Sequence, residues 1–228
     1  MFNGKKKAIT FSYDDGVTQD RRLVEILNKY GLKATFNINS ELLGTDNTLI
    51  REGKKILHNK IKPEEVAELY RGHEVAVHTL THPHLTVLDE REIIRQVEQD
   101  RKNLTSLVGY EVVGMAYPGG GFQNSDRVER VIKNHTGVKY ARTISLSYSF
   151  DEQENIFRYK PTAFHIDFAD NYRLADEFFA SDAAGVFYIW GHSYEFDIND
   201  TWDEFEKFCK YISGREDVFY GTNKEILL

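Results

Sequence analysis

The sequence predicts a single α/β domain in which most strands run parallel. Strand-like and helix-like segments alternate along nearly the whole 228-residue chain, and right-handed crossovers make consecutive strands parallel in this order. No repeat, low-complexity tract or linker divides it. The composition, 41% hydrophobic and 29% charged, allows one substantial core. We therefore expect one domain over residues 1–228, built as an α/β barrel or a doubly wound sheet.

The first half of the chain begins with an apolar strand and an amphipathic helix. Residues 7–13, "KAITFSY", form a segment rich in apolar and β-branched residues, as expected of a buried strand. In the next segment Leu23, Ile26 and Leu27 share one helical face, and Gly31 can end that helix. The other elements expected in this half are strands at 33–39 and 74–79, helices at 62–73 and 88–109, and a loop with some irregular helix at 40–60.

The second half repeats the alternation. Its single cysteine, Cys209, falls on a helical stripe with Phe205, Phe208 and Ile212, which favours a buried apolar role over a disulfide or a metal cluster. The elements expected here are strands at 111–118, 138–143, 185–192 and 218–222, helices at 125–135, 171–181 and 201–214, and an irregular stretch at 144–168.

Charge and hydropathy exclude several classes of partner. The formal net charge is -7, and the basic run at 5–7 stands alone, which disfavours a nucleic-acid partner. The longest apolar run, 183–191, is too short to cross a membrane. The N-terminus lacks the apolar segment of a signal peptide. We expect a cytoplasmic protein as the sequence stands, or an extracytoplasmic one if a signal peptide has been removed.

Reactive side chains follow three of the expected strands. Asp14 and Asp15 follow the first strand, His78 and His82 come at the end of 74–79, and His192 ends the strand at 185–192. Because ligands collect at the C-terminal ends of parallel strands, we expect these side chains to converge on one site.

The histidine pair and the aspartate pair suggest metal chemistry. Two imidazoles from one turn, His78 and His82, can face one cation, and one carboxylate would complete a catalytic set with open positions. The second carboxylate could then take a proton from a metal-bound water. Two other interpretations remain open. His78 could be a hydrogen-bonded core residue and His82 a surface residue, and Asp14 and Asp15 could form an Asx turn.

A glycine-rich turn and an aromatic strand complete the candidate site. The turn at 117–121, with Tyr117, Pro118 and Gly119, could aim backbone N–H groups at an oxyanion, or it could be an ordinary tight turn. His192 could donate a proton to a leaving group, with Trp190 as an apolar or sugar-stacking wall, or it could simply be hydrogen-bonded at a strand end. The remaining histidines are expected at surface or structural positions: His58, His73, His84, His135 and His165.

Taken in order, these motifs resemble those of the polysaccharide deacetylases of the NodB-homology group, carbohydrate esterase family 4. The segment "TFSYDDG" is similar to the first family motif, Thr-Phe-Asp-Asp-Gly, with Ser12 and Tyr13 read as an insertion. The segment "HTLTHP" at 78–83 matches the second motif in full. The segments "AYPGG" at 116–120 and "YIWGH" at 188–192 resemble the third and fifth motifs.

The resemblance implies a distorted (β/α) barrel of about seven mostly parallel strands. It implies that Asp15, His78 and His82 bind Zn²⁺ or another divalent transition metal, that Asp14 is the general base and that His192 is the general acid. The oxyanion donor would be a backbone N–H near Gly119. The activity implied is removal of an N-acetyl, or less readily an O-acetyl, group from a carbohydrate.

Two departures keep other functions open. The arginine common in the third motif is Ala116 here, and no fourth motif is found, so we expect Arg158 or Lys160 to orient Asp14 instead. The alternatives are allantoinase-like hydrolysis of a small non-sugar amide and a carbohydrate-binding relative without turnover.

Overall fold

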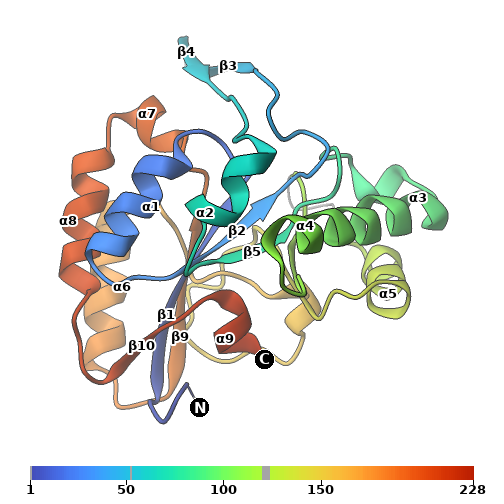
Figure 1. The fold of residues 1–228 in the computed structure, drawn as a ribbon. Helices are drawn as coiled ribbons and strands as arrows, with labels where there is room; N and C mark the ends of the chain where they lie inside the picture. Colours follow the sequence, from blue (N-terminus) through green and yellow to red (C-terminus); the bar gives the residue numbers. More distant parts are fainter. Residues whose placement is uncertain (1, 52, 120–123) are drawn as a thin grey trace.

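The computed structural model describes residues 2–51, 53–119 and 124–228, and most of its strands form one curled sheet (Figure 1). The strands of this sheet are β1 (Lys7–Asp14), β2 (Ala34–Ile38), β5 (Glu74–Val77), β6 (Gly114–Ala116), β7 (Tyr140–Arg142), β8 (Ala163–Phe164), β9 (Gly185–Gly191) and β10 (Val218–Tyr220). Their order is β7-β6-β5-β2-β1-β9-β8, and β10 pairs with β1. Within the described ranges every pairing in this sheet is parallel.

A single segment spans the space between the two edges of the sheet. The Tyr159 N–H donates to the Ala141 carbonyl at 2.9 Å, and the Thr143 N–H donates back to Tyr159 at 2.9 Å, so this residue lies along β7. Three residues later the Thr162 N–H donates to the Tyr188 carbonyl at 2.8 Å, and the chain continues into β8 beside β9. The sheet thus curls towards closure, and the expected distorted barrel of mostly parallel strands is confirmed.

Helices surround the sheet, and the longer ones bury an apolar face on its outer side. The helices are α1 (Asp20–Lys29), α2 (Val66–Leu69), α3 (Glu90–Ile94), α4 (Asp100–Val108), α5 (Asp126–His135), α6 (Phe168–Ala180), α7 (Glu195–Asn199), α8 (Trp202–Ile212) and α9 (Asn223–Leu227). In Figure 1 α1, α6 and α8 gather on one side of the sheet, and α3, α4 and α5 on the other. Cys209 is fully buried in α8, as the sequence predicts.

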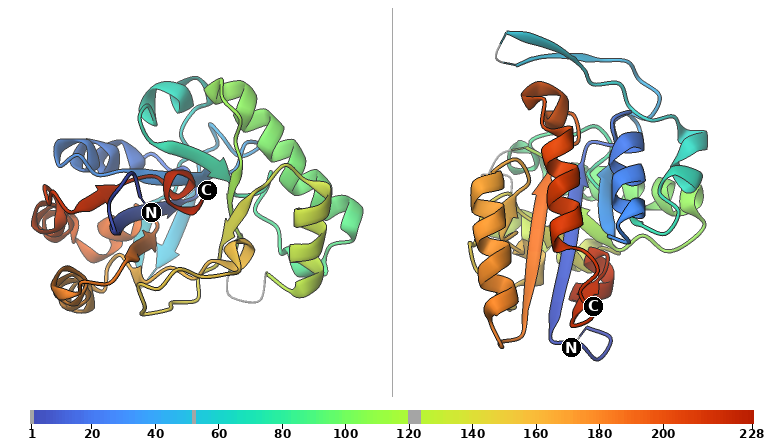
Figure 2. Two further views of the ribbon diagram at one scale, coloured as in Figure 1. Left: turned by 90° about the horizontal axis from the view of Figure 1, so that it is seen from below. Right: turned by 90° about the vertical axis from the view of Figure 1, so that its left-hand side faces the viewer.

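Two local predictions need correction. The helix expected at 88–109 is α3 and α4 joined by a π-helical turn, Arg95–Gln99. The described residues of the stretch 40–60 include no helix. They form an antiparallel hairpin, β3 (Thr48–Arg51) and β4 (Lys54–Leu57), which projects beyond the strand ends (Figure 2). The sequence does not reveal this hairpin, because its apolar residues stand in adjacent pairs, Leu49–Ile50 and Ile56–Leu57, and lack the alternation that indicates a strand.

The first strand runs without a bulge into the aspartates. Phe11 through Asp14 pair in unbroken register with β2, so Ser12 and Tyr13 are ordinary strand residues. The first-motif segment is therefore better matched as Ser-Tyr-Asp-Asp-Gly, with no insertion. The turn that follows requires Gly16, because its φ is +61° and a Cβ there would lie 2.7 Å from Ile38 Cγ2.

The opposite end of the barrel is closed by α9. The Asn223 side chain donates to Thr10 Oγ1 at 2.8 Å, and the Lys224 N–H donates to the buried Glu74 carboxylate at 2.9 Å. Polar groups that would otherwise be unpaired inside the barrel are satisfied in this way. The other end of the barrel, where the C-terminal ends of the strands lie, is left accessible.

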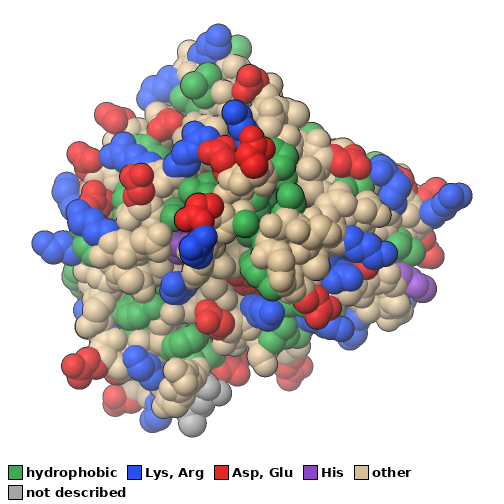
Figure 3. Space-filling view, in the orientation of Figure 1, with side chains coloured by type: hydrophobic (Ala, Val, Ile, Leu, Met, Phe, Trp, Pro, Cys, Tyr) green, Lys and Arg blue, Asp and Glu red, His purple; other side chains and the backbone are tan. Residues whose placement is uncertain are grey.

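None of the helices in the described parts of the chain is long and apolar enough to cross a membrane. On the face in Figure 3, basic and acidic side chains are interspersed rather than gathered in a basic stripe.

Candidate active site

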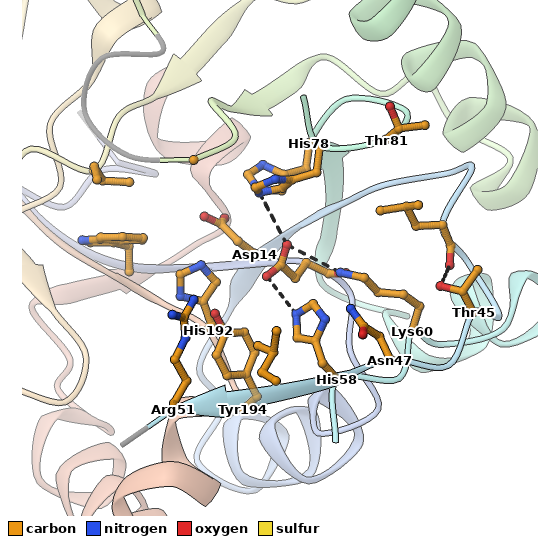
Figure 4. A pocket seen from close by; sticks show the side chains of 17 residues that line it. Asp14, Thr45, Asn47, Arg51, His58, Lys60, His78, Thr81, His192 and Tyr194 are labelled. Atoms are coloured by element: carbon orange, nitrogen blue, oxygen red, sulfur yellow. Dashed lines mark hydrogen bonds and ion pairs between the residues drawn. The ribbon is translucent and has the colours of Figure 1, made fainter. Parts of the chain in front are cut away.

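A cavity of about 560 Å³ opens at the C-terminal strand ends, beside the β3–β4 hairpin (Figure 4). The residues predicted from the sequence that line it are Asp14, Asp15, His78, His82, Gly119, Trp190 and His192. Tyr117 and Pro118 are not part of its lining, and the buried Tyr117 hydroxyl donates to the Phe157 carbonyl at 3.0 Å. Residues 120 and 121 of the predicted turn lie outside the described residues.

Asp15, His78 and His82 form a cluster of metal-type donors. One ligand atom from each lies within 4.8 Å of the others. His78 Nδ1 lies 2.9 Å from the Ala116 carbonyl, which fixes the proton on Nδ1 and turns the Nε2 lone pair towards the cluster. His78 Nε2 is buried and has no hydrogen-bond partner among the described residues. This donor set fits a divalent transition-metal ion.

Burial keeps both of these imidazoles neutral, which is the form that binds a metal. It lowers the pKa of His78 to about 4 and also lowers the pKa of His82. The backbone at Asp15 and His82 is left-handed, with φ of 82° and 58°. Such conformations are costly for side-chain-bearing residues and are concentrated at functional sites.

The loop that carries the two histidines is held by a neighbouring loop and a helix. Asn39 donates to the His78 carbonyl at 2.6 Å, while the His78 N–H donates to the Asp100 carboxylate of α4 at 3.2 Å. The Leu80 N–H donates to the carbonyl of Gln96 at 3.0 Å. Gln96 lies in the π-helical turn, so this irregularity directs a carbonyl at the histidine loop.

Asp14 is buried against an arginine that the sequence analysis overlooked. The Arg142 guanidinium, at the end of β7, donates to both oxygens of Asp14, and Asn37 donates to Asp14 Oδ1 at 2.9 Å. Arg142 also donates from Nε to Ser12 Oγ at 3.1 Å. Burial alone would raise the pKa of Asp14, but Arg142, with smaller contributions from two histidines, lowers it below the usual value. Asp14 is therefore an ionised, fixed carboxylate.

The prediction that Arg158 or Lys160 orients Asp14 is wrong. Arg158 pairs with Asp126 and Glu129, each at 2.7 Å, and Lys160 is exposed. Arg158 ends the short helical turn after β7, and Lys160 comes two residues later. Neither lines the cavity, whereas Arg142, a strand residue of β7, reaches the barrel interior.

His192 is paired with a glutamate three residues further on. His192 Nδ1 lies 3.2 Å from Glu195 Oε2, and the same oxygen lies 2.8 Å from Nε2 of the buried His165. Burial would lower the pKa of His192, but the hydrogen bond and charge of Glu195 raise it to about 9. Glu195 is thus the acidic partner of His192, and the buried His165 contacts the same carboxylate oxygen from behind.

Two further residues contact Asp15 from the base of the hairpin. His58 Nε2 lies 3.2 Å from Asp15 Oδ2, and Lys60 Nζ donates to the Asp15 carbonyl at 2.7 Å. The Ile61 N–H donates to the Gly16 carbonyl at 3.0 Å, which joins this segment to the aspartate turn. No local pattern marks His58 or Lys60 as site residues, because only this long-range pairing brings them to the cavity.

The fold and the site together define a (β/α) barrel of the deacetylase type, with paired aspartates and separate histidines at the strand ends. A family model described as polysaccharide deacetylase matches residues 3–141. The chain belongs to the polysaccharide deacetylase family.

Solved structures of carbohydrate esterase family 4 share the fold. The Xyl-CE4 domain of a multidomain xylanase from the hindgut metagenome of Trinervitermes trinervoides is 17% identical, with a TM-score of 0.63 over 98% of this chain and 90% of that one. A family 4 carbohydrate esterase from Streptomyces lividans, in complex with acetate, is 14% identical, with a TM-score of 0.55 over 96% and 92%.

A third similar structure is a family 4 pseudoenzyme from Bacillus anthracis, which is 19% identical, with a TM-score of 0.54 over 100% of this chain and 67% of that one. At these identities the similarity concerns the fold. Because one fold carries both esterases and a pseudoenzyme, the function of this chain has to be argued from its own side chains.

Proposed function

We propose that this protein is a metal-dependent hydrolase that removes N-acetyl groups, or less readily O-acetyl groups, from a carbohydrate. The observation that carries the proposal is the convergence of Asp15, His78 and His82 within 4.8 Å, with Asp14 and His192 on the same cavity. Zn²⁺ or a similar divalent ion would be held by those three residues. When bound, such an ion polarises an acetyl carbonyl and lowers the pKa of water.

Asp14 acts as the general base. It is ionised at neutral pH, and Arg142 and Asn37 fix both its position and its orientation. A carboxylate held in this way accepts a proton from the attacking water without rearrangement. The Tyr117 N–H already donates to the backbone carbonyl of Arg142, and Pro118 has no N–H. Gly119 therefore supplies the first backbone N–H of this turn that can donate to the oxyanion.

His192 acts as the general acid. With a pKa of about 9 it is protonated at neutral pH, and it can give its proton to the departing nitrogen. An amine leaves poorly unless it is protonated, so this step favours N-deacetylation. Trp190, which lines the same cavity, offers an apolar wall against which a sugar ring can stack.

The Glu195–His192 pair leads to a prediction for pH dependence. In Glu195→Gln the carboxylate that raises the pKa of His192 is removed, so the pKa should fall from about 9 towards the usual 6.5. Because the acid must be protonated, the alkaline limb of the kcat/KM profile should move to lower pH in this variant. The profile is measured as acetate release from pH 5 to 10.

The matched control is Glu204→Gln, which removes a carboxylate that pairs with Lys207 on the surface of α8. It should leave the alkaline limb where it is. If Glu195→Gln does not shift the alkaline limb, His192 is not the general acid.

The activity itself is tested by acetate release from N-acetylated oligosaccharides incubated with the metal-loaded protein. A carbohydrate-binding relative without turnover would bind these sugars and release no acetate. Allantoin serves as the small-amide comparison, and its hydrolysis in preference to the sugars would contradict the proposal.

A further inference from the structure

The hairpin beside the cavity has two unlike faces. β3 and β4 pair Leu49 with Ile56 and Arg51 with Lys54, and alternate residues of a strand point to the same side. These four side chains therefore share one face. Leu49 and Ile56 pack in a cluster with Val17, Tyr194 and Ile198, which directs this face towards the cavity.

Arg51 and Lys54 are directly opposite one another on that face. Like charges in this position are unfavourable in a strand pair, so the arrangement calls for an explanation. Lys54 donates from Nζ to the Ile198 carbonyl at 2.5 Å, near the end of α7. Arg51 has no ion pair or hydrogen bond with any residue in the described ranges. It lines the cavity, and Figure 4 shows its guanidinium directed towards His192 and Tyr194.

The carboxylates on the cavity wall already have cationic partners. Asp14 is matched by Arg142, and Asp15 lies 3.5 Å from the ammonium of Lys60. The positive charge of Arg51 is therefore not needed to balance either aspartate. An arginine at the mouth of an acid–base site, with no anionic partner among the residues that the structure describes, is suited to an anion that arrives with the substrate.

We infer that Arg51 binds a carboxylate of the substrate, which makes the substrate an N-acetylated sugar that carries a carboxylate close to its acetamido group. The acetamido group of this substrate rests on the proposed function. A guanidinium presents a planar pair of N–H donors that matches a carboxylate. A cation at the mouth of the cavity also steers an anion towards a chain whose net charge is -7.

The test uses a glycan fragment containing N-acetylmuramic acid and the same fragment with its lactyl carboxylate methyl-esterified. The wild-type protein should prefer the acid by about tenfold or more in kcat/KM. Arg51→Gln should lose most of this preference through a higher KM, with kcat within about twofold, and Arg51→Lys should keep part of it.

The matched control is Lys55→Gln. Lys55 is an exposed residue opposite Ile50, on the outer face of the same hairpin. Its replacement by Gln therefore removes one positive charge from the hairpin and none from the cavity wall. This control should keep the wild-type preference. If Lys55→Gln loses the preference as fully as Arg51→Gln does, the preference comes from the overall charge of the hairpin, and the assignment to Arg51 is overturned.

Binding of the same two fragments is measured by calorimetry on metal-loaded Asp14→Asn protein, with and without Arg51→Gln, so that the result does not depend on turnover. The inference is supported if the acid binds more tightly than the ester and this difference disappears in Arg51→Gln, even if no acetate is ever released. Equal binding of acid and ester overturns it, and leaves the proposed function intact if wild-type protein deacetylates both.

Discussion

Asp14→Asn is expected to lower the rate of acetate release by about 10²–10⁴-fold, the range that a general base contributes, while the metal content of the protein stays unchanged. The amide has nearly the shape of the carboxylate but cannot accept the proton of the attacking water. Asp14 lies beside the donor cluster and is not one of its three members. Single-turnover acetate release and elemental analysis are measured on the same preparation.

The neighbouring variant Asp15→Asn is the matched comparison. It should lose most of its metal and most of its activity together, because Asp15 contributes the carboxylate of the donor cluster. An Asp14→Asn protein that loses metal as completely as Asp15→Asn would make Asp14 a ligand. One that deacetylates at the wild-type rate would remove it from the mechanism.

Arg142→Gln is expected to lower the free energy of unfolding by about 3–5 kcal/mol, because it leaves the Asp14 carboxylate buried without its cation. Both side chains are almost fully buried, with exposed fractions of 1% and 3%. Activity should fall as well, since the general base loses the group that keeps it ionised and oriented. Urea unfolding followed by circular dichroism measures the stability.

Arg173→Gln is the control, because Arg173 lies on α6 and pairs with Asp170 and Glu177, and all three side chains are about half exposed. It should cost no more than about 1 kcal/mol, as surface ion pairs do. The double variant Asp14→Asn with Arg142→Gln should recover part of the stability, because two neutral amides remain in place of an unpaired charge. If Arg142→Gln lowers the free energy of unfolding by no more than Arg173→Gln does, the buried pair does not stabilise the barrel.

The barrel and the central residues of the site could be predicted because their signals are local. Alternation of apolar strands and amphipathic helices gives the parallel order, and the strand ends mark Asp14, His78 and His192. Arg142 and Glu195 could have been found by the same reasoning, since one ends β7 and the other follows His192 by a single turn. Arg142 was missed because the family motif places its common arginine at the position of Ala116, and Glu195 because it lies outside all the matched motifs.

The hairpin contribution could not be predicted in the same way. His58 and Lys60 reach Asp15 only because their segment pairs with the backbone at Gly16 and Val17, far away in the sequence. Arg51 faces the cavity only in the register that β3 adopts with β4. Long-range pairing of this kind leaves no periodic trace in a polar stretch.

The most direct test of the central claim is acetate release from N-acetylated oligosaccharides, both neutral and carboxylate-bearing, before and after the metal is removed from one sample by a strong chelator. We predict about one divalent ion per chain bound at Asp15, His78 and His82, loss of activity on chelation and recovery when zinc is restored. Undiminished acetate release by the metal-free protein would contradict the account.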